Sequence, residues 1–205
     1  MLSLNNKIEA NDFGKDKKLI LNLNSDIPII IVNGCGGVGK DEFVKALDEF
    51  VTVFSYSTID TYKKIAKESF DWDEVKDEKG RKLLSDLKLA GINYNDAPLK
   101  EFKDVYTDIN RSCLADVFTC MCRDIGEIKK IKNEFPDTIT VLVTNNRVQH
   151  ISSNVADDNV YNYQYDYIIN NDSTIDVLKE SAKTFILDVF GKYFDDDILD
   201  GDIYE

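Results

Sequence analysis

Hydrophobic residues recur along the central part of the chain with two different spacings, which predict strands and helices in alternation. Positions 29–32 are four consecutive β-branched residues, a run typical of a strand buried on both faces of a parallel sheet. Similar runs predict further strands over 51–55, 116–122, 138–144 and 165–169. Hydrophobic residues at helical spacing predict helices over 40–50, 59–69, 78–90, 99–114, 127–135 and 174–190. This alternation predicts a three-layer α/β fold with a five-stranded, mostly parallel sheet and right-handed crossovers.

Glycine and proline residues set the expected ends of several helices. We expect Gly91 to end the helix over 78–90 from the C′ position and Gly191 to end the last helix. Pro136 stops the helix over 127–135. The four tyrosines between 161 and 167 occupy every second position, so we expect them on a strand, in core and edge packing.

The length of the chain, 205 residues, suits one well-buried domain. We expect this domain over 28–190, after an amino-terminal arm or edge strand over 1–27. The segment 145–163 is polar and irregular, and we expect it to form a lid within the domain. Residues 191–205 form an acidic tail that buries little apolar surface.

Charge and composition exclude several classes of protein. The formal net charge is −13, so the surface repels nucleic-acid backbones and anionic membranes. No apolar run approaches the roughly 20 residues that span a bilayer, and positions 1–10 lack the apolar core of a signal peptide. The four cysteines form no CxxC pair and the chain has one histidine, so we expect reduced thiols and no structural zinc site. These features predict a soluble cytoplasmic protein.

A glycine-rich segment after the first strand carries the most specific signal in the chain. Gly34, Gly39 and Lys40 match the pattern G-x-x-x-x-G-K, between a buried strand and a helix as the motif requires. Glycines let consecutive backbone N–H groups point at phosphate oxygens, the helix start adds its positive dipole end, and the lysine binds the outer phosphates. We therefore expect the following residues to bind a nucleoside triphosphate: Gly34, Cys35, Gly36, Gly37, Val38, Gly39, Lys40, Asp41 and Glu42.

The position after the lysine differs from the usual motif, because Asp41 replaces the serine or threonine whose hydroxyl binds Mg²⁺. A carboxylate is a hard oxygen ligand that suits Mg²⁺, directly or through water, so Asp41 is a candidate metal ligand. An acidic residue in the first turn also stabilises a helix by itself. The sequence leaves both roles open.

The segment Gly39-Lys40-Asp41 after a strand resembles the deoxynucleoside monophosphate kinases of bacteriophages and their bacterial relatives, in the adenylate-kinase-like branch of P-loop kinases. The resemblance extends over roughly residues 28–190 and includes further segments in the family's order: 54–58 with Lys63 and Lys64, 81–84, Arg123 with Glu127, and 166–172. It implies the P-loop NTPase fold. It also implies transfer of the γ-phosphoryl group of ATP, with Mg²⁺, to a nucleoside or deoxynucleoside monophosphate.

The four arginines of the chain are the candidates to bind the reacting phosphates. Phosphoryl transfer needs positive groups around a spreading negative charge, and arginine is the favoured clamp for phosphate. Arg123 follows the third strand and Arg147 opens the lid, so we expect them, with Lys40, to stabilise the transferring group. The acceptor is expected to contact Arg81, Arg111 and Ser57. The alternative for each arginine is a surface ion pair in an acidic protein.

One departure from the family pattern keeps other functions open. The family often has an acid two residues before the arginine of the third strand, where this chain has Met121. The rivals are a nucleotide-binding protein without phosphoryl transfer and a kinase with a non-nucleotide acceptor; phosphomevalonate kinases of the animal type also have Gly-Lys-Asp. We expect small-molecule nucleotides as partners, no nucleic acid and no membrane, and a homodimer stays open.

Overall fold

The computed structural model describes residues 26–75, 77–148 and 159–191. Five strands form one sheet in the order β2-β3-β1-β4-β5, and all four strand pairs are parallel. The strands are β1 (Ile29–Asn33), β2 (Val53–Ser57), β3 (Val117–Met121), β4 (Ile139–Thr144) and β5 (Tyr167–Asn170). The predicted α/β fold is confirmed, and its sheet is parallel throughout. Most of the expected arm and tail, and the centre of the expected lid, lie outside the described residues.

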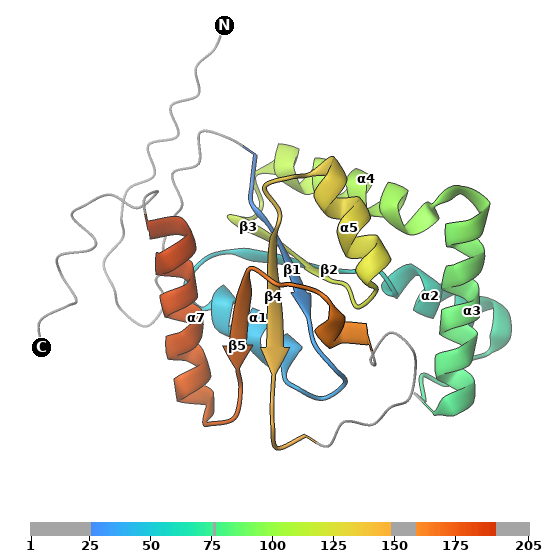
Figure 1. Ribbon diagram of the computed structural model, residues 1–205. Helices are drawn as coiled ribbons and strands as arrows, with labels where there is room; N and C mark the ends of the chain where they lie inside the picture. Colours follow the sequence, from blue (N-terminus) through green and yellow to red (C-terminus); the bar gives the residue numbers. More distant parts are fainter. Residues whose placement is uncertain (1–25, 76, 149–158, 192–205) are drawn as a thin grey trace, which may run out of the picture.

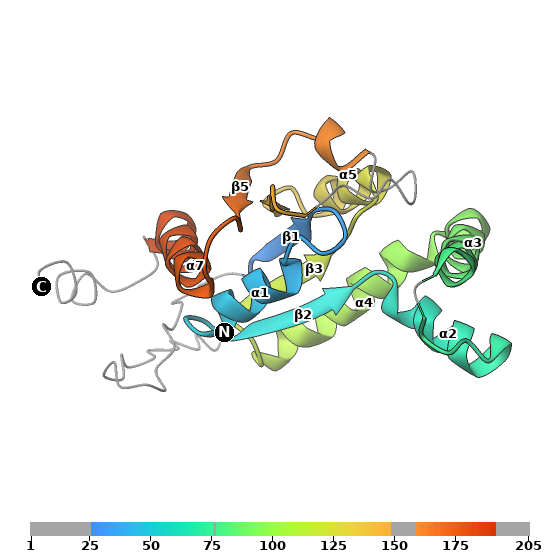
Figure 2. The same cartoon turned by 90° about the horizontal axis from the view of Figure 1, so that it is seen from below.

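Helices cover both faces of this sheet (Figures 1 and 2). One face packs against α1 (Lys40–Asp48) and α7 (Ile175–Phe190), and the other against α4 (Ala97–Ser112) and α5 (Ile125–Glu134). Successive residues of a strand point to opposite faces. Accordingly, the even-numbered residues of β1 lie in the first core and Ile29 and Ile31 in the second, which explains why β1 is hydrophobic without alternation.

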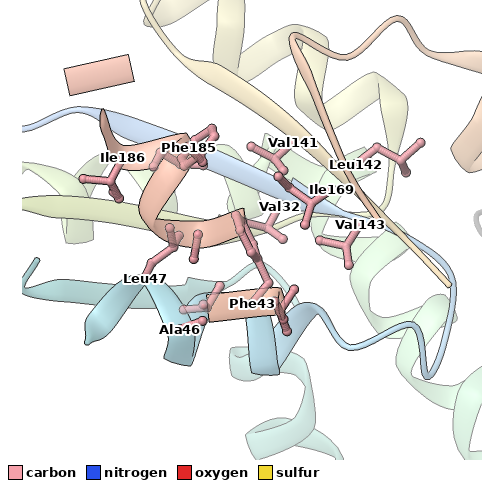
Figure 3. Packing of buried hydrophobic residues seen from close by; sticks show 14 of the residues in the cluster. Val32, Phe43, Ala46, Leu47, Val141, Leu142, Val143, Ile169, Phe185 and Ile186 are labelled. Carbon is pink, nitrogen blue, oxygen red and sulfur yellow. The ribbon is translucent and has the colours of Figure 1, made fainter. Parts of the chain in front are cut away.

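Figure 3 shows the core between the sheet, α1 and α7 from close by. Phe43 of α1 and Phe185 of α7 meet edge to face, with ring centroids 5.8 Å apart, beside Val32 of β1. Burying a side chain of this size contributes about 1.5–3 kcal/mol. This packing fixes α1 against β1, and therefore fixes both ends of the turn that joins them.

The helices α2 (Asp60–Phe70) and α3 (Glu78–Asn95) form a pair that we call the helical arm. Both views place the helical arm at the end of the molecule opposite α7 (Figures 1 and 2). Figure 1 also shows that α3 begins on the side toward which the strands point and ends where α4 begins. No helix in the three described ranges has the length and apolar character needed to cross a bilayer.

The sequence predicted that Gly91 would end its helix, and this prediction is wrong. The helix α3 continues through Gly91 to Asn95, and Asp96 takes the left-handed conformation at its end, with φ 56°. A Cβ at Gly91 would lie 2.3 Å from the hydroxyl oxygen of Tyr62 on α2. The glycine is therefore needed where the two helices of the arm approach each other.

Other element boundaries also differ from prediction. The strand β2 begins at Val53 because the N–H groups of Phe50 and Val51 still bond to the carbonyl of Leu47, as a last turn of α1. The helix α5 begins two residues early, at Ile125, because the Asp124 carboxylate caps it. The alternating tyrosines do not all belong to a strand: β5 begins only at position 167, and a 3-10 turn, η1 (Val160–Asn162), precedes it.

Candidate nucleotide-binding site

The candidate site lies at the edge where all five strands end. In open α/β sheets, ligands bind outside the carboxyl ends of the strands, next to the point where the strand order reverses. Here β1 is the central strand, flanked by β3 and β4, and the glycine-rich turn leaves its carboxyl end. The sheet topology therefore places residues 34–40 where a ligand is expected.

The backbone of this turn explains why its glycines are required. Gly34, Gly37 and Gly39 have φ values of 148°, 80° and 92°, which residues with a Cβ rarely adopt. A Cβ at Gly34 would lie 2.4 Å from the carbonyl oxygen of Val143, and one at Gly39 would lie 2.2 Å from the side-chain nitrogen of Asn171. The turn is thus packed closely against the ends of β4 and β5.

Lys40 begins α1, and its side chain folds back over the turn. The ammonium donates to the carbonyl oxygens of Gly34 at 2.7 Å and Cys35 at 2.6 Å. Ionised phosphate oxygens are stronger acceptors than these carbonyls, so a bound triphosphate would attract the same ammonium. Asp41 and Glu42 follow in the first turn of α1, and both are exposed.

Residues from the far end of the chain support the same turn. The Asn171 side chain, after β5, donates to the carbonyl oxygen of Val38 at 3.0 Å. Asn33, the last residue of β1, is fully buried and accepts a 2.7 Å hydrogen bond from the N–H of Gly34. Sequence analysis missed both asparagines, because their partners depend on how β5 packs in the fold.

Arg123 and Arg147 both lie at the carboxyl edge, as predicted. Arg123 is exposed after β3, and its carbonyl oxygen accepts from the Asn33 side chain at 3.4 Å. Arg147 follows β4 and donates through Nη2 to the carbonyl oxygens of Ser173, at 2.8 Å, and Asn171, at 3.3 Å. Arg147 therefore lies beside the loop after β5 that also contacts the glycine-rich turn.

The predicted acceptor residues are not all brought together. Arg81 is exposed in the first turn of α3, and its guanidinium makes no hydrogen bond or ion pair with any described residue. Ser57 ends β2, beside Met121 of β3. Arg111 lies in the last turn of α4, next to Asn110, which binds Asp26 and Ile27 ahead of β1. Arg111 thus lies at the amino edge of the sheet, opposite the site, so we leave it out of the proposed acceptor residues.

The structure shows a buried charged cluster that sequence analysis did not predict. The Lys88 ammonium, on α3, lies 2.6 Å from Oε2 of Glu127 and donates to the Thr58 hydroxyl at 2.8 Å. The Thr58 hydroxyl and the Cys122 thiol also donate to Oε2 of Glu127, both at 3.3 Å. Oε1 of Glu127 is buried without a partner among the described residues. Burial, together with Glu127, raises the pKa of the Cys122 thiol well above its usual range, so this cysteine is a neutral donor.

The side chains near the turn can be compared with the needs of Mg²⁺. This ion is usually bound by one or two carboxylates together with substrate phosphates and water, and the exposed Asp41 carboxylate could supply one such ligand. No group of three or more histidine, cysteine, aspartate or glutamate residues in the described ranges could hold a metal by itself. Met121 ends β3 beside Val32 of β1, where the resemblance would have placed an acid. The residues present therefore fit a Mg²⁺ ion that arrives with a nucleotide.

Comparison with known proteins finds only distant similarity. No protein-family model matches the chain, and no curated protein matches it. Among solved structures, it is similar to a sugar kinase from a Janibacter species, with 10% identity, a TM-score of 0.46, and coverage of 82% of this chain and 99% of that chain. An APS kinase of Mycobacterium tuberculosis gives 12% identity, a TM-score of 0.43 and coverage of 81% and 98%. A putative kinase of Chloroflexus aurantiacus gives 12% identity, a TM-score of 0.42, and coverage of 81% of this chain and 99% of that chain.

Proposed function

We propose that this protein binds ATP with Mg²⁺ and transfers the γ-phosphoryl group to a nucleoside or deoxynucleoside monophosphate. The observation that carries the proposal is the turn over 34–40. Gly34, Gly37 and Gly39 have positive φ values, which allow consecutive backbone N–H groups to point at a phosphate. The turn opens a helix, and its lysine ammonium lies across it. Packing alone does not require a lysine at this position.

Each residue of the proposed donor site has a role in this reaction. The loop amides and Lys40 bind the β- and γ-phosphates, and Asp41 binds Mg²⁺ directly or through water. When bound, Mg²⁺ neutralises charge that develops on the phosphate oxygens. Arg123 and Arg147 stabilise the transferring group, because a positioned guanidinium favours the spread of negative charge in the transition state. Arg147 would have to exchange its backbone partners for phosphate.

The acceptor is proposed to bind between the glycine-rich turn and the helical arm. Arg81 supports this proposal because its guanidinium is exposed and has no partner among the described residues, so it is available to an acceptor phosphate. Ser57 ends β2, the edge strand from which the chain continues into the helical arm. The Lys88–Glu127 pair joins α3 of the helical arm to α5.

The test is to mix the purified protein with Mg-ATP and each of the common nucleoside and deoxynucleoside monophosphates, and to measure ADP. We expect ADP with one or a few acceptors, and loss of turnover in Lys40→Ala. If none of the acceptors yields ADP above the Lys40→Ala background, the kinase assignment fails.

The second candidate is a protein that binds the nucleotide without transferring phosphate. Two observations favour it: Met121 ends β3 where the resemblance would place an acid, and Asp41 stands in place of the hydroxyl residue after the lysine. ATP binding without turnover on any acceptor would support this candidate. Turnover only with a non-nucleotide small molecule would instead indicate a P-loop kinase of different acceptor class.

A further inference from the structure

A chain of hydrogen bonds, buried or partly buried, joins the glycine-rich turn, Arg123 and the segment that leads into β5. The Asn33 side chain is its centre. Its oxygen accepts from the N–H of Gly34 at 2.7 Å, and its nitrogen donates to the Tyr165 hydroxyl at 2.7 Å and to the Arg123 carbonyl at 3.4 Å. We propose that Asn33 and Tyr165 are positioning residues that hold the start of the phosphate loop and Arg123 at a fixed separation. The proposal rests on the function proposed above.

Asn33 is suited to this role because it is completely buried and its amide bonds in three directions. Its relative exposure is 0%, and a buried amide without partners is costly. The side chain bonds to backbone groups at the ends of two neighbouring strands, β1 and β3, and to a hydroxyl beyond β4. A hydrophobic side chain at this position would fill the space but would leave the Gly34 N–H unpaired.

Tyr165 completes the chain because its hydroxyl acts as acceptor and donor at once. The hydroxyl accepts from Asn33 and donates to the carbonyl of Val160 at 2.8 Å. Burial raises the pKa of Tyr165 above its usual range, so the hydroxyl keeps the proton that it donates. The neighbouring Tyr161 hydroxyl lies 3.7 Å from the thiol sulfur of Cys35. The segment before β5 therefore contacts the glycine-rich turn at Cys35 and the residue just before the turn, Asn33.

The effect expected from these bonds falls on the chemical step. Transfer requires the γ-phosphoryl group and Arg123 to meet in one geometry, and displacements of about 1 Å cost a large part of the rate. ATP affinity depends mainly on the remaining loop amides and Lys40, which the bonds of Tyr165 do not involve. Loss of the Tyr165 hydroxyl should therefore lower kcat while ATP affinity changes little.

The experiment compares Tyr165→Phe with Tyr106→Phe in the full chain. Each substitution removes one hydroxyl that donates to a backbone carbonyl, and keeps the ring. The Tyr106 hydroxyl donates to the carbonyl of Ile27 at 2.9 Å, at the amino edge of the sheet and away from the site, so it controls for general loss of stability. The measurements are kcat with the accepted monophosphate, ATP Kd by calorimetry, and hydrogen–deuterium exchange of peptides covering 33–40 and 122–127.

We expect Tyr165→Phe to lower kcat about fivefold with ATP Kd within twofold of the wild type, which is the effect of one neutral hydrogen bond of about 1 kcal/mol. Exchange should rise in both peptides, and Tyr106→Phe should change neither kcat nor these peptides. An unchanged kcat in Tyr165→Phe, or an equal loss in both variants, overturns the proposal. If the wild type has no turnover, the kinase assignment fails, and exchange decides the positioning role: unchanged exchange in Tyr165→Phe refutes it, and faster exchange in both peptides supports it.

Discussion

Removal of one partner of the Lys88–Glu127 ion pair should be among the most destabilising single changes outside the hydrophobic cores. The Lys88 side chain is 15% exposed and that of Glu127 is 9% exposed. Removing one partner from a buried pair costs about 3–5 kcal/mol, because the other charge stays buried without compensation. Glu127 keeps two donors, Thr58 and Cys122, so we expect the lower end, about 3 kcal/mol, for Lys88→Met.

The matched control is Lys82→Met on the same helix. The Lys82 ammonium lies 2.8 Å from Oδ2 of Asp86, but these side chains are 73% and 59% exposed. Exposed pairs four residues apart on a helix contribute about 0.3–0.5 kcal/mol. A chain of this length loses roughly 2–4 °C of Tm per kcal/mol, so we expect a decrease of about 6–12 °C for Lys88→Met and less than about 2 °C for Lys82→Met.

Urea unfolding, followed by circular dichroism and by the fluorescence of Trp72, measures both variants. Trp72 follows α2 in the helical arm, so a transition that occurs earlier by fluorescence than by circular dichroism would show that the arm detaches first. The double variant Lys88→Met/Glu127→Gln should recover part of the loss, since no uncompensated carboxylate remains. A loss below about 1 kcal/mol in Lys88→Met would refute the assignment of a costly buried pair.

Three further predictions test the loop and the sheet. At an ATP concentration of about 100 times Kd, the wild type should gain roughly 5–10 °C in Tm, and Lys40→Ala should show almost no shift at the same concentration. Gly34→Ala should lower the free energy of unfolding in urea by about 2 kcal/mol or more, because Gly34 has a φ of 148° and an added Cβ would lie 2.4 Å from the Val143 carbonyl oxygen. A Cβ at Gly36 would meet no atom within 4 Å, so Gly36→Ala is the control. Equal losses in Gly34→Ala and Gly36→Ala would contradict this prediction. Partial burial alone would raise the pKa of Asp166, but hydrogen bonds from Thr140 and Lys132 outweigh it and hold that pKa below its usual value of 3.8. The stabilisation from the ionised carboxylate is therefore present above about pH 4 and is lost as pH falls through the lowered pKa. Asp166→Asn should accordingly flatten the acid limb of the curve of unfolding free energy against pH.

Much of the fold could be predicted from the sequence because the signals are local. The hydrophobic run at 29–32 and the glycine-rich segment after it are adjacent in the chain, so β1, the glycine-rich turn and α1 were predicted in place. Gly91 shows the limit of such reasoning. A glycine near the end of a hydrophobic pattern is typical of a helix end, but here its role is the contact with Tyr62 on α2, a packing requirement that periodicity does not contain.

The candidate site likewise combines features that are local in the sequence with contacts between residues far apart in the chain. The phosphate loop is continuous in sequence, whereas the Asn33–Tyr165 bond joins residues 132 positions apart and the Lys88–Glu127 contact spans 39 positions. Arg111 was expected near the acceptor, but it lies in the last turn of α4 at the amino edge of the sheet, a position that topology predicts. A helix that leads into a parallel strand ends at the amino edge of the sheet, and ligands bind at the carboxyl edge.

The two sides of the carboxyl edge are fixed by different interactions, and this difference bears on how each would tolerate substitution. The glycine-rich turn is fixed by backbone conformation and by close contacts with Val143 and Asn171, which leave no room for a side chain at Gly34 or Gly39. The helical arm is joined to the body through helix packing and one buried ion pair. Much of its surface, including Arg81, is exposed. We therefore expect substitutions on the exposed face of the arm to change acceptor use while ATP binding persists. Substitutions of Gly34, Gly39 or Lys40 should remove both, because the acceptor can react only with a triphosphate that the turn has bound.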